Sequence, residues 1–260
     1  MSVQHISTRD AYNQWASVYD TDGNMLQAID DLELEQLLPE LLNLGSVGSK
    51  SLAVARKLEL LDLGCGTGRN TAKLLTHPWA QPVFVRAIDF SSRMLDIAEK
   101  KLLTLHEENK MVDLMLNQAD CFPTVTDKSA SPVPNVEGLG TFDIVISTLV
   151  LEHVPLQDYF ATLAVLVKKG GYALVTNMHS EMGRISQAGF VNAEGVKVRG
   201  TSFAHTPEMT VEAAREAGFE IMNVKERTMT EADVKGGRVS ERGWKWVGTQ
   251  VWYGLMLRRQ

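Results

Sequence analysis

The sequence predicts an α/β fold: a seven-stranded, mostly parallel, doubly wound sheet with an antiparallel last strand and an N-terminal helical lid. Apolar stretches of strand length alternate with helical patterns from residue 58 to residue 218, which is typical of a parallel sheet covered on both faces. Two further strand patterns follow with no helix expected between them, so they most simply pair antiparallel. A glycine-rich turn directly after the strand expected at residues 58–63 indicates a ligand site at the edge of the sheet.

The composition is that of one ordinary globular domain. The 260 residues are 44% apolar and 22% charged, with a net charge of −6. An acidic balance without a basic cluster disfavours nucleic acid as a partner. Cys65 and Cys121 form no CxxC motif, and we expect both to be reduced. With no signal-peptide pattern and no apolar stretch near ~18 residues, we expect a cytoplasmic protein with no membrane partner.

The first 50 residues predict the lid, and residues 51–260 the main domain. Residues 25–44 have roughly helical apolar spacing, and Pro39 is expected to interrupt that helix. The stretch GSVGSKS then ends the pattern. Aromatic residues also recur at roughly helical spacing near the start of the chain, namely Tyr12, Trp15 and Tyr19.

The main domain follows in order. The expected strands are 58–63, 82–89, 112–120, 142–151, 172–178, 219–229 and 247–259, and the expected helices are 67–75, 91–108, 157–169 and 207–218. Ser91 fits an N-cap and Pro207 a first helical position, and Gly170 with Gly171 is expected to end the helix at 157–169. Residues 126–141 predict a loop. Residues 179–206 show no clear period and are expected to form an excursion on the substrate side.

The glycine turn LDLGCGTG (61–68) is not a dinucleotide fingerprint. Its glycines are spaced G-x-G-x-G, and Arg69 occupies the position of the third glycine in G-x-G-x-x-G. A nicotinamide oxidoreductase is therefore disfavoured. The chain also lacks G-K-[ST], which excludes a P-loop. A ligand with a carboxylate and a ribose, but no phosphate, fits such a turn.

Two carboxylates follow the next strands. Asp89 ends the second strand and can accept hydrogen bonds from both hydroxyls of a ribose. Asp120, in NQADCFP, can accept from an adenine amine, with Cys121 and Phe122 beside the ring. Taken alone, Asp120 is better explained as a turn residue before Pro123. Because the carboxyl ends of parallel strands share one edge, we expect these side chains in one crevice.

Four motifs in order, LDLGCGTGRNT, AIDFSSRML, NQADCFP and FDIVISTLVLEHV, resemble those of the class I S-adenosylmethionine-dependent methyltransferases over roughly residues 56–177. Within that family the chain resembles the ubiquinone/menaquinone-type branch and fungal small-molecule methyltransferases. It most resembles the enzymes that methylate thiols of reduced gliotoxin-like dithiols. The stretches that carry this last resemblance are YNQWASVYDTDGN, SQAGFVNAEGVKVRGTSFAHT and WKWVGTQVWYGLML.

The resemblance implies S-adenosyl-L-methionine as the cofactor and S-adenosyl-L-homocysteine as its product. It implies that Gly64, Gly66 and Gly68 line the methionine side, and that Asp62 orients their loop. Leu149 would lie under the sulfonium and contribute backbone.

On the nucleoside side, the resemblance implies that Asp89 holds the ribose hydroxyls, with Phe90 and Met94 near the adenine. Asp120 would accept from the adenine amine, and Cys121 would flank it.

The N-terminal segment would close over the cofactor, and Tyr12 and Tyr19 are the tyrosines expected to contact it. The excursion would supply an apolar wall, which also fits ordinary core packing. Its apolar candidates are Met178, Met182, Phe190 and Phe203.

Three histidines are candidate general bases: His153 in LEHVP, His179 in NMHS and His205 in FAHTP. His153 follows the fourth strand, beside the expected methyl position. For His153, a structural role with a hydrogen bond to a nearby loop explains the residue equally well. His179 follows the fifth strand on the same ligand-facing edge, and for His205 a role in loop packing is favoured over catalysis. The chain has no HxxxH or paired carboxylates at metal-ligand spacing, so no metal is expected.

We therefore expect a methyltransferase that acts on a small molecule, as a monomer or weak homodimer. S-methylation of a dithiol secondary metabolite is favoured, because a thiol of pKa about 8.5 needs less help from a base than a phenol of pKa about 10. The alternatives are C- or O-methylation of a quinone-like or phenolic metabolite, or a non-catalytic partner protein that keeps the fold.

Overall fold

A seven-stranded sheet forms the centre of the computed structural model, which describes residues 2–47, 56–123 and 131–260. The strand order is β4-β3-β2-β5-β6-β10-β9, and β10 runs antiparallel to both of its neighbours while the other pairs are parallel. This confirms the predicted fold class. The strands are β2 (Leu58–Leu63), β3 (Val83–Asp89), β4 (Val112–Gln118), β5 (Phe142–Thr148), β6 (Val167–Met178), β9 (Phe219–Thr228) and β10 (Gln250–Arg259). The boundary expected after residue 50 and the start of the loop expected at 126–141 lie outside the described residues.

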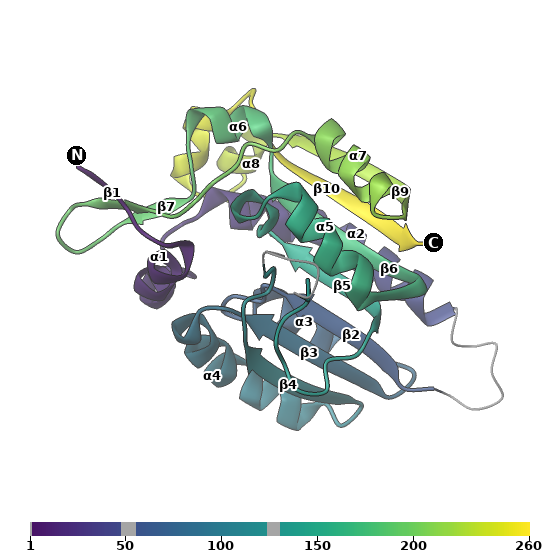
Figure 1. The fold of residues 1–260 in the computed structure, drawn as a ribbon. Helices are drawn as coiled ribbons and strands as arrows, with labels where there is room; N and C mark the ends of the chain where they lie inside the picture. The colour runs from purple at the N-terminus through teal and green to yellow at the C-terminus, as the bar shows by residue number, and fades with distance from the viewer. Residues whose placement is uncertain (1, 48–55, 124–130) are drawn as a thin grey trace.

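Helices cover both faces of the sheet (Figure 1). Strand β2 explains why: Leu58 and Leu60 belong to one apolar cluster, whereas Leu61 and Leu63 belong to the other. A strand buried on both faces is a continuous apolar run, which is what the sequence contains. The first cluster includes α2 (Met25–Val47), α3 (Arg69–Thr76) and α4 (Ser92–Glu108), and the second includes α5 (Leu156–Leu166) and α7 (Pro207–Glu216).

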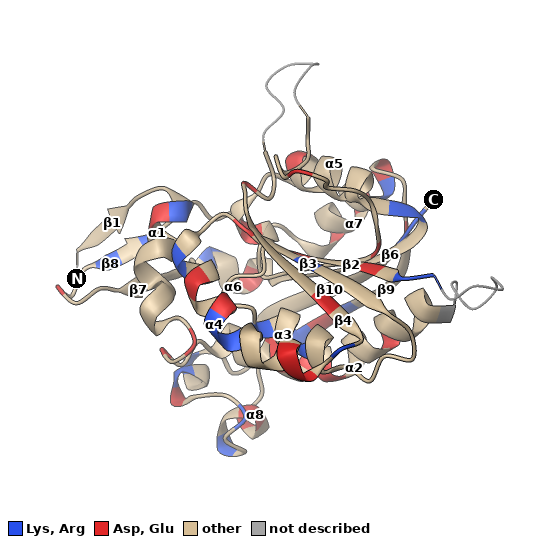
Figure 2. Cartoon of the chain, turned by 90° about the horizontal axis from the view of Figure 1, so that it is seen from below, with Lys and Arg blue, Asp and Glu red and all other residues tan. Residues whose placement is uncertain are grey.

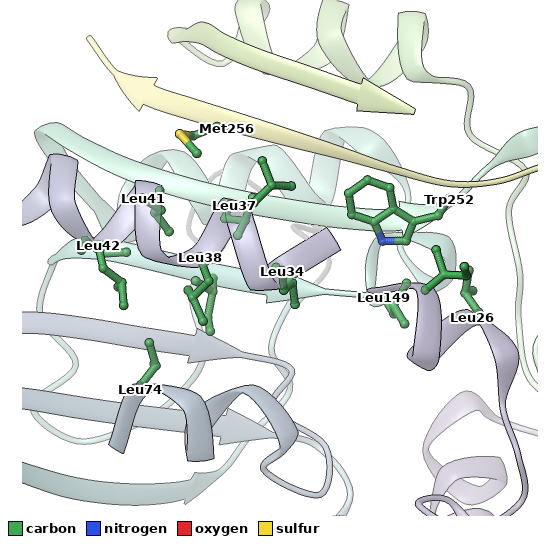
Figure 3. Close-up of a cluster of buried hydrophobic side chains, with 14 of the residues drawn as sticks. Leu26, Leu34, Leu37, Leu38, Leu41, Leu42, Leu74, Leu149, Trp252 and Met256 are labelled. Carbon is green, nitrogen blue, oxygen red and sulfur yellow. The ribbon is translucent and has the colours of Figure 1, made fainter. Parts of the chain in front are cut away.

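Helix α2 packs into the core of the main sheet. Its leucines point toward the strands, and Trp252 and Met256 of β10 lie close by (Figure 3). The expected interruption at Pro39 is wrong, since α2 continues through it. Pro39 removes one helical hydrogen bond, to the carbonyl of Glu35, and both residues face solvent. That carbonyl can therefore bond to water while the apolar face continues unbroken.

Asp30 of α2 holds this helix to the rest of the fold. Its side chain is fully buried and accepts hydrogen bonds from Thr176 Oγ1 at 2.6 Å and Trp252 Nε1 at 2.8 Å. The Arg69 guanidinium, at the start of α3, pairs with the other carboxylate oxygen at 2.5 Å. One aspartate thus connects α2 to β6, β10 and α3, and the removal of one partner from such a buried pair typically costs about 3–5 kcal/mol.

A second, three-stranded sheet lies beside α1 (Thr8–Trp15) and η1 (Ala16–Val18), at the N-terminal end of the molecule (Figure 1). In the order β1-β8-β7, it joins the start of the chain to the excursion expected at 179–206. The excursion is therefore more regular than expected. Its elements are α6 (Ser180–Ile185), β7 (Gly189–Val191) and β8 (Lys197–Arg199), and the partner strand is β1 (Val3–His5).

The structure also differs from the sequence prediction at the end of α5 and in the segment between β9 and β10. Helix α5 ends at Leu166, and Gly170 with Gly171 lies inside β6. A Cβ on Gly171 would come within 2.9 Å of two backbone carbonyl oxygens, so close strand packing explains that glycine. The expectation of no helix between the last two strands is also wrong. Helix α8 (Glu231–Lys235) and η3 (Glu241–Trp246) lie there, but they are too short to cross the sheet, and β9 and β10 still pair antiparallel.

The helix starts predicted at Ser91 and Pro207 are confirmed. Ser91 accepts the Met94 N–H at the start of α4, and Pro207 is the first residue of α7. Acidic and basic residues alternate along α4 (Figure 2). Among the residues that the structure describes, no helix has the length and apolar character needed to cross a bilayer.

Candidate functional site

A cavity of about 540 Å³ lies at the carboxyl ends of β2, β3, β4 and β5, under α1. We call it the first cavity. It brings together residues from five separate parts of the chain, as expected where parallel strands end at one edge. Ten of the candidate site residues line it: Tyr12, Tyr19, Gly64, Gly66, Asp89, Phe90, Asp120, Cys121, Leu149 and His153.

The glycine turn exposes bare backbone to this cavity. Gly64 and Gly66 have φ values of 82° and 54°, which side-chain-bearing residues rarely adopt. A Cβ on Gly64 would come within 2.5 Å of Val150 Cγ2, so a larger residue would collide there. A Cβ on Gly66 would meet nothing within 4 Å and would point into open space. A ligand can therefore approach the Gly66 backbone directly.

Asp89 ties the glycine turn to the end of β3. Its Oδ2 accepts the Gly66 N–H at 2.9 Å and its Oδ1 accepts the Ser91 N–H at 2.8 Å. Burial raises the pKa of the Asp89 carboxyl to about 6, and these backbone bonds oppose the rise. The Phe90 backbone also bonds to this carboxylate, and since a carboxylate has about four acceptor positions, at least one remains for a ligand in the cavity.

Asp120 is a turn residue that also lies at the first cavity. Its Oδ1 accepts the Phe122 N–H at 3.1 Å, which makes it a turn residue, and it also lines the first cavity. Phe122 stacks on Tyr159 with ring centroids 4.5 Å apart. Cys121 is buried, and burial raises the pKa of its thiol well above the usual value, so it stays a protonated, unreactive thiol.

Leu149 holds an unusual backbone conformation at the end of β5. Its φ is 55°, and no other non-glycine residue among those described has a positive φ. Its N–H donates to the Thr176 carbonyl at 2.9 Å. Such a conformation costs about 1–3 kcal/mol and is concentrated at functional sites. It directs the chain into η2 (Leu151–His153), where the next polar groups lie.

His153 is held neutral, and both of its ring nitrogens are in use. Its Nδ1 lies 2.6 Å from the Thr201 carbonyl, which can only accept, so Nδ1 carries the proton. Its Nε2 therefore accepts the Tyr12 hydroxyl at 2.8 Å. Burial lowers the pKa of His153 to about 4. This histidine holds Tyr12 over the cavity, and its basic lone pair is already occupied.

Three candidate cofactor residues lie outside the first cavity. Asp62 is buried and accepts the Thr71 hydroxyl at 2.6 Å, so it braces the start of α3 behind the turn. Gly68 has a φ of 78°, and a Cβ there would come within 2.9 Å of Leu102 Cδ1. It therefore allows α3 and α4 to pack closely, instead of lining the ligand space. Met94 is fully buried in α4.

The other two histidines also lie elsewhere. His179 caps α6: its Nδ1 accepts the Glu181 N–H, and its Nε2 lies 3.1 Å from a carboxylate oxygen of Glu226. His205 bonds to the Val154 carbonyl through Nε2 at 2.9 Å and stacks on Phe203. Neither side chain lines the first cavity, so the geometry gives no support to a catalytic role for either.

A second cavity of about 110 Å³ lies across Tyr12, Tyr19 and Leu149 from the first. These three residues line both cavities and so form the wall between them. The far side is built from the lid, from Met178 and Met182 with the excursion, and from η3.

Glu152 lines the second cavity, and the sequence analysis missed it. It is 3% exposed, and its Oε2 has no hydrogen-bond partner. Burial raises the pKa of its carboxyl to about 8. The backbone is fixed on both sides, because its N–H donates to Asn177 Oδ1 at 2.8 Å and its carbonyl accepts the Phe203 N–H at 2.7 Å. The sequence did contain one signal for Glu152: the residue lies directly before His153 and shortly after the end of a strand.

Comparisons with known proteins agree on one family. A family model described as a methyltransferase domain matches residues 61–173. An uncharacterized methyltransferase of Emericella nidulans is 40% identical over 273 residues, covering 97% of this chain and 91% of that protein. Ubiquinone biosynthesis O-methyltransferase of Caulobacter vibrioides is 28% identical over 134 residues, covering 50% of this chain and 45% of that protein. The crystal structure of magnesium protoporphyrin IX methyltransferase from Synechocystis PCC 6803, with bound S-adenosylhomocysteine, has a TM-score of 0.58 at 16% identity and covers 97% of each chain.

Proposed function

This chain belongs to the class I S-adenosylmethionine-dependent methyltransferases, and we propose that it methylates a thiol of a small molecule, with a reduced gliotoxin-like dithiol as the expected type of acceptor. Methyl transfer and the cofactor follow from the family. When bound, that cofactor supplies a methyl group on a positively charged sulfur. The acceptor and the residue roles are our proposal.

We propose that the first cavity holds the cofactor. The bare backbone of Gly66 and the remaining acceptor capacity of the Asp89 carboxylate suit a ligand with a ribose, and the absence of a phosphate-binding sequence suits a nucleoside without phosphate. Asp120 would accept from the adenine amine, and Tyr12 would cover the opposite end near Leu149. These residues bind and orient, and the lid excludes water.

One observation carries the choice of acceptor class. The three stretches that resemble thiol-methylating enzymes lie far apart in the sequence, yet residues from all of them line the second cavity. They contribute Tyr12 to Asn24, Ser186 to Lys197, and Lys245 with Trp246. The three stretches thus meet beside Leu149, where we expect the acceptor to approach the methyl group.

The state of His153 supports the same choice. The lone pair on its Nε2 accepts a hydrogen bond from the Tyr12 hydroxyl. The first cavity therefore offers no histidine that is available as a base. A thiol loses its proton more readily than a phenol, by about 1.5 pKa units, and so needs the weaker base. The methionine side chains of the second cavity suit a soft, polarizable sulfur nucleophile.

The size of the second cavity limits how an acceptor can bind. Sites for drug-sized ligands are typically about 300–1,000 Å³, whereas this cavity is about 110 Å³. It holds the reacting end of a dithiol, and we expect α1 to move outward to admit a ring system. Movement of such a lid commonly limits turnover.

The test is a methyl-transfer panel with the purified full-length protein and S-adenosylmethionine. The acceptors are a reduced epidithiodiketopiperazine, dithiothreitol, a monothiol, a phenol and a hydroquinone, and the products are identified by mass spectrometry. We expect methylation on sulfur, fastest with the dithiols. Methylation of the phenol or hydroquinone, with no product from any thiol, would refute the proposal.

O- or C-methylation of a quinone-like or phenolic metabolite is the second candidate. The named relative from Caulobacter vibrioides, a ubiquinone biosynthesis O-methyltransferase, favours it over half of the chain. The hydroquinone and phenol in the panel test it directly.

A further inference from the structure

We propose that the second cavity is the acceptor site, that it takes a small thiol carrying a negatively charged group, and that Glu152 accepts the proton of that thiol. The inference rests on the proposed thiol chemistry for its reaction, while the charge preference of the cavity can be tested by binding alone. For a dithiol, the second sulfur, as thiolate, would be the charged group.

Glu152 is placed to act on a group in this cavity. The cavity lies across Leu149 from the proposed cofactor site, and Glu152 follows Leu149 by three residues. Its Oε2 is buried and unpartnered, which destabilises the protein unless a ligand satisfies it. Asn177 and Phe203 fix the backbone from which this side chain extends. A buried acceptor without a partner is explained by a donor that arrives with the substrate.

The groups around Glu152 leave it as the available base. His153 Nε2 lies 3.8 Å from its Oε1 but already accepts from Tyr12. Tyr12, Tyr19 and Tyr253 are buried phenols whose pKa values burial raises above 10, so they stay neutral. Burial also raises the pKa of Glu152 to about 8, close to that of a thiol, which suits proton exchange between the two.

Cations line the outer part of the same cavity. Lys197 comes from β8, and Arg242 and Lys245 come from η3. Among the described residues, no carboxylate forms an ion pair with any of the three. Burial lowers the pKa of Lys197, and the neighbouring cations Arg199, Lys245 and Arg242 lower it further. Asp22 also lines this cavity, but its carboxylate oxygens accept from Trp15 Nε1 and the Asn24 N–H.

The two ends of the cavity therefore select one kind of molecule. An anionic group would neutralise the outer cations, and the thiol would reach inward toward Glu152 and Leu149. In the reaction, the S–H bond breaks and its proton goes to the Glu152 carboxylate. The acceptor sulfur then bonds to the methyl group, whose bond to the cofactor sulfur breaks and leaves its electron pair there. Charge and atoms balance without any further reactant.

The first experiment measures binding without turnover. 3-Mercaptopropionate and its uncharged methyl ester are titrated by calorimetry into the full-length protein saturated with S-adenosylhomocysteine. We expect the acid to bind about tenfold tighter or more, the value of one charge-assisted hydrogen bond. Lys197→Gln and Lys245→Gln should lose this preference, whereas Lys100→Gln, an exposed lysine on α4, should keep it. Equal binding of acid and ester, or binding of neither, would overturn the site.

The second experiment compares Glu152→Gln with wild type, using the best thiol of the panel, between pH 6.5 and pH 10. At pH 7 a carboxyl of pKa about 8 is ionised in about a tenth of the molecules, whereas a thiol of pKa about 8.5 is only about 3% ionised, so the variant should be about threefold slower in kcat there. The deficit should disappear near pH 10, where the thiol ionises unaided. S-Adenosylhomocysteine affinity should be unchanged. A variant as fast as wild type at pH 7, or slower by the same factor at every pH, would refute the role of Glu152.

The outcomes separate the two proposals. Thiol methylation with an unaffected Glu152→Gln variant would leave the proposed function in place and remove this inference. Methylation of phenols alone would remove the proposed function and the thiol step with it, while the binding titration would still decide the charge preference.

Discussion

Replacing Glu152 by Gln should remove a pH-dependent loss of stability. Burial raises the pKa of this carboxyl from 4.5 to about 8, so the folded protein keeps a proton that the unfolded chain releases above pH 4.5. The free energy of unfolding must then fall as pH rises from about 4.5 to 8, and level off beyond. At about 1.4 kcal/mol per pKa unit, the upper limit of this fall is about 5 kcal/mol. Gln cannot ionise, so the variant should lack it.

Urea denaturation at pH 5 and pH 9 measures the effect. The fall in unfolding free energy between the two pH values should be smaller in Glu152→Gln by up to that limit, which makes the variant the more stable protein at pH 9. Asp62 and Asp89, whose pKa values burial raises to about 6, contribute equally to both proteins. Glu99→Gln, at an exposed position on α4, serves as the control and should follow wild type. Parallel losses in wild type and Glu152→Gln would show that the buried carboxyl is not held protonated.

Three further predictions concern the first cavity and the fold. Asp89→Asn should weaken S-adenosylhomocysteine binding by about 10- to 100-fold, because one charge-assisted hydrogen bond is worth about 1.5–3 kcal/mol. Calorimetry measures this affinity, and Asp96→Asn is the control. An unchanged affinity would place the ribose elsewhere. His153 should stay neutral between pH 8 and pH 5, because burial lowers its pKa to about 4. The ¹⁵N chemical shifts of its ring, measured by NMR, should not titrate in this range. A titration midpoint near pH 6.5 would contradict the prediction. Asp30→Asn should lower the unfolding free energy by about 1.5–3 kcal/mol, because Arg69 loses the charge of its buried partner but keeps Asp31 at 2.7 Å. In urea, a loss below about 1 kcal/mol, the value of an exposed pair, would contradict that reasoning.

The central sheet was predictable because burial on both faces makes each parallel strand a continuous apolar run, as in β2. Helix starts were predictable from local chemistry, as at Ser91 and Pro207. The small sheet was not. Its strands have three residues each, too few to show a period, and β1 pairs with a strand more than 190 residues away. The continuous helix through Pro39 depends on which face meets solvent, and that is a property of the packed protein.

The candidate site was also predictable only in part. Gly64, Asp89 and Asp120 follow the carboxyl ends of parallel strands, and because these ends share one edge of the sheet, their meeting around one cavity could be predicted. The choice between His153 and Glu152 could not be made from sequence. The two are adjacent, and only the turn of η2 and the bonds from Tyr12 and Thr201 show that the histidine is occupied while the carboxylate is unpartnered.

The three bonds to Asp30 have a consequence for how the enzyme opens. A helix fastened at once to β6, β10 and α3 cannot swing away as a gate, so in the opening that we propose the moving segment ends before Met25. Gly23, with a φ of 71°, lies two residues upstream, where its carbonyl accepts the Ser240 hydroxyl, and that bond would have to break. A protein shortened to begin at Met25 should still fold and leave the cofactor cleft permanently open. One shortened past Val47 would lose part of its own core.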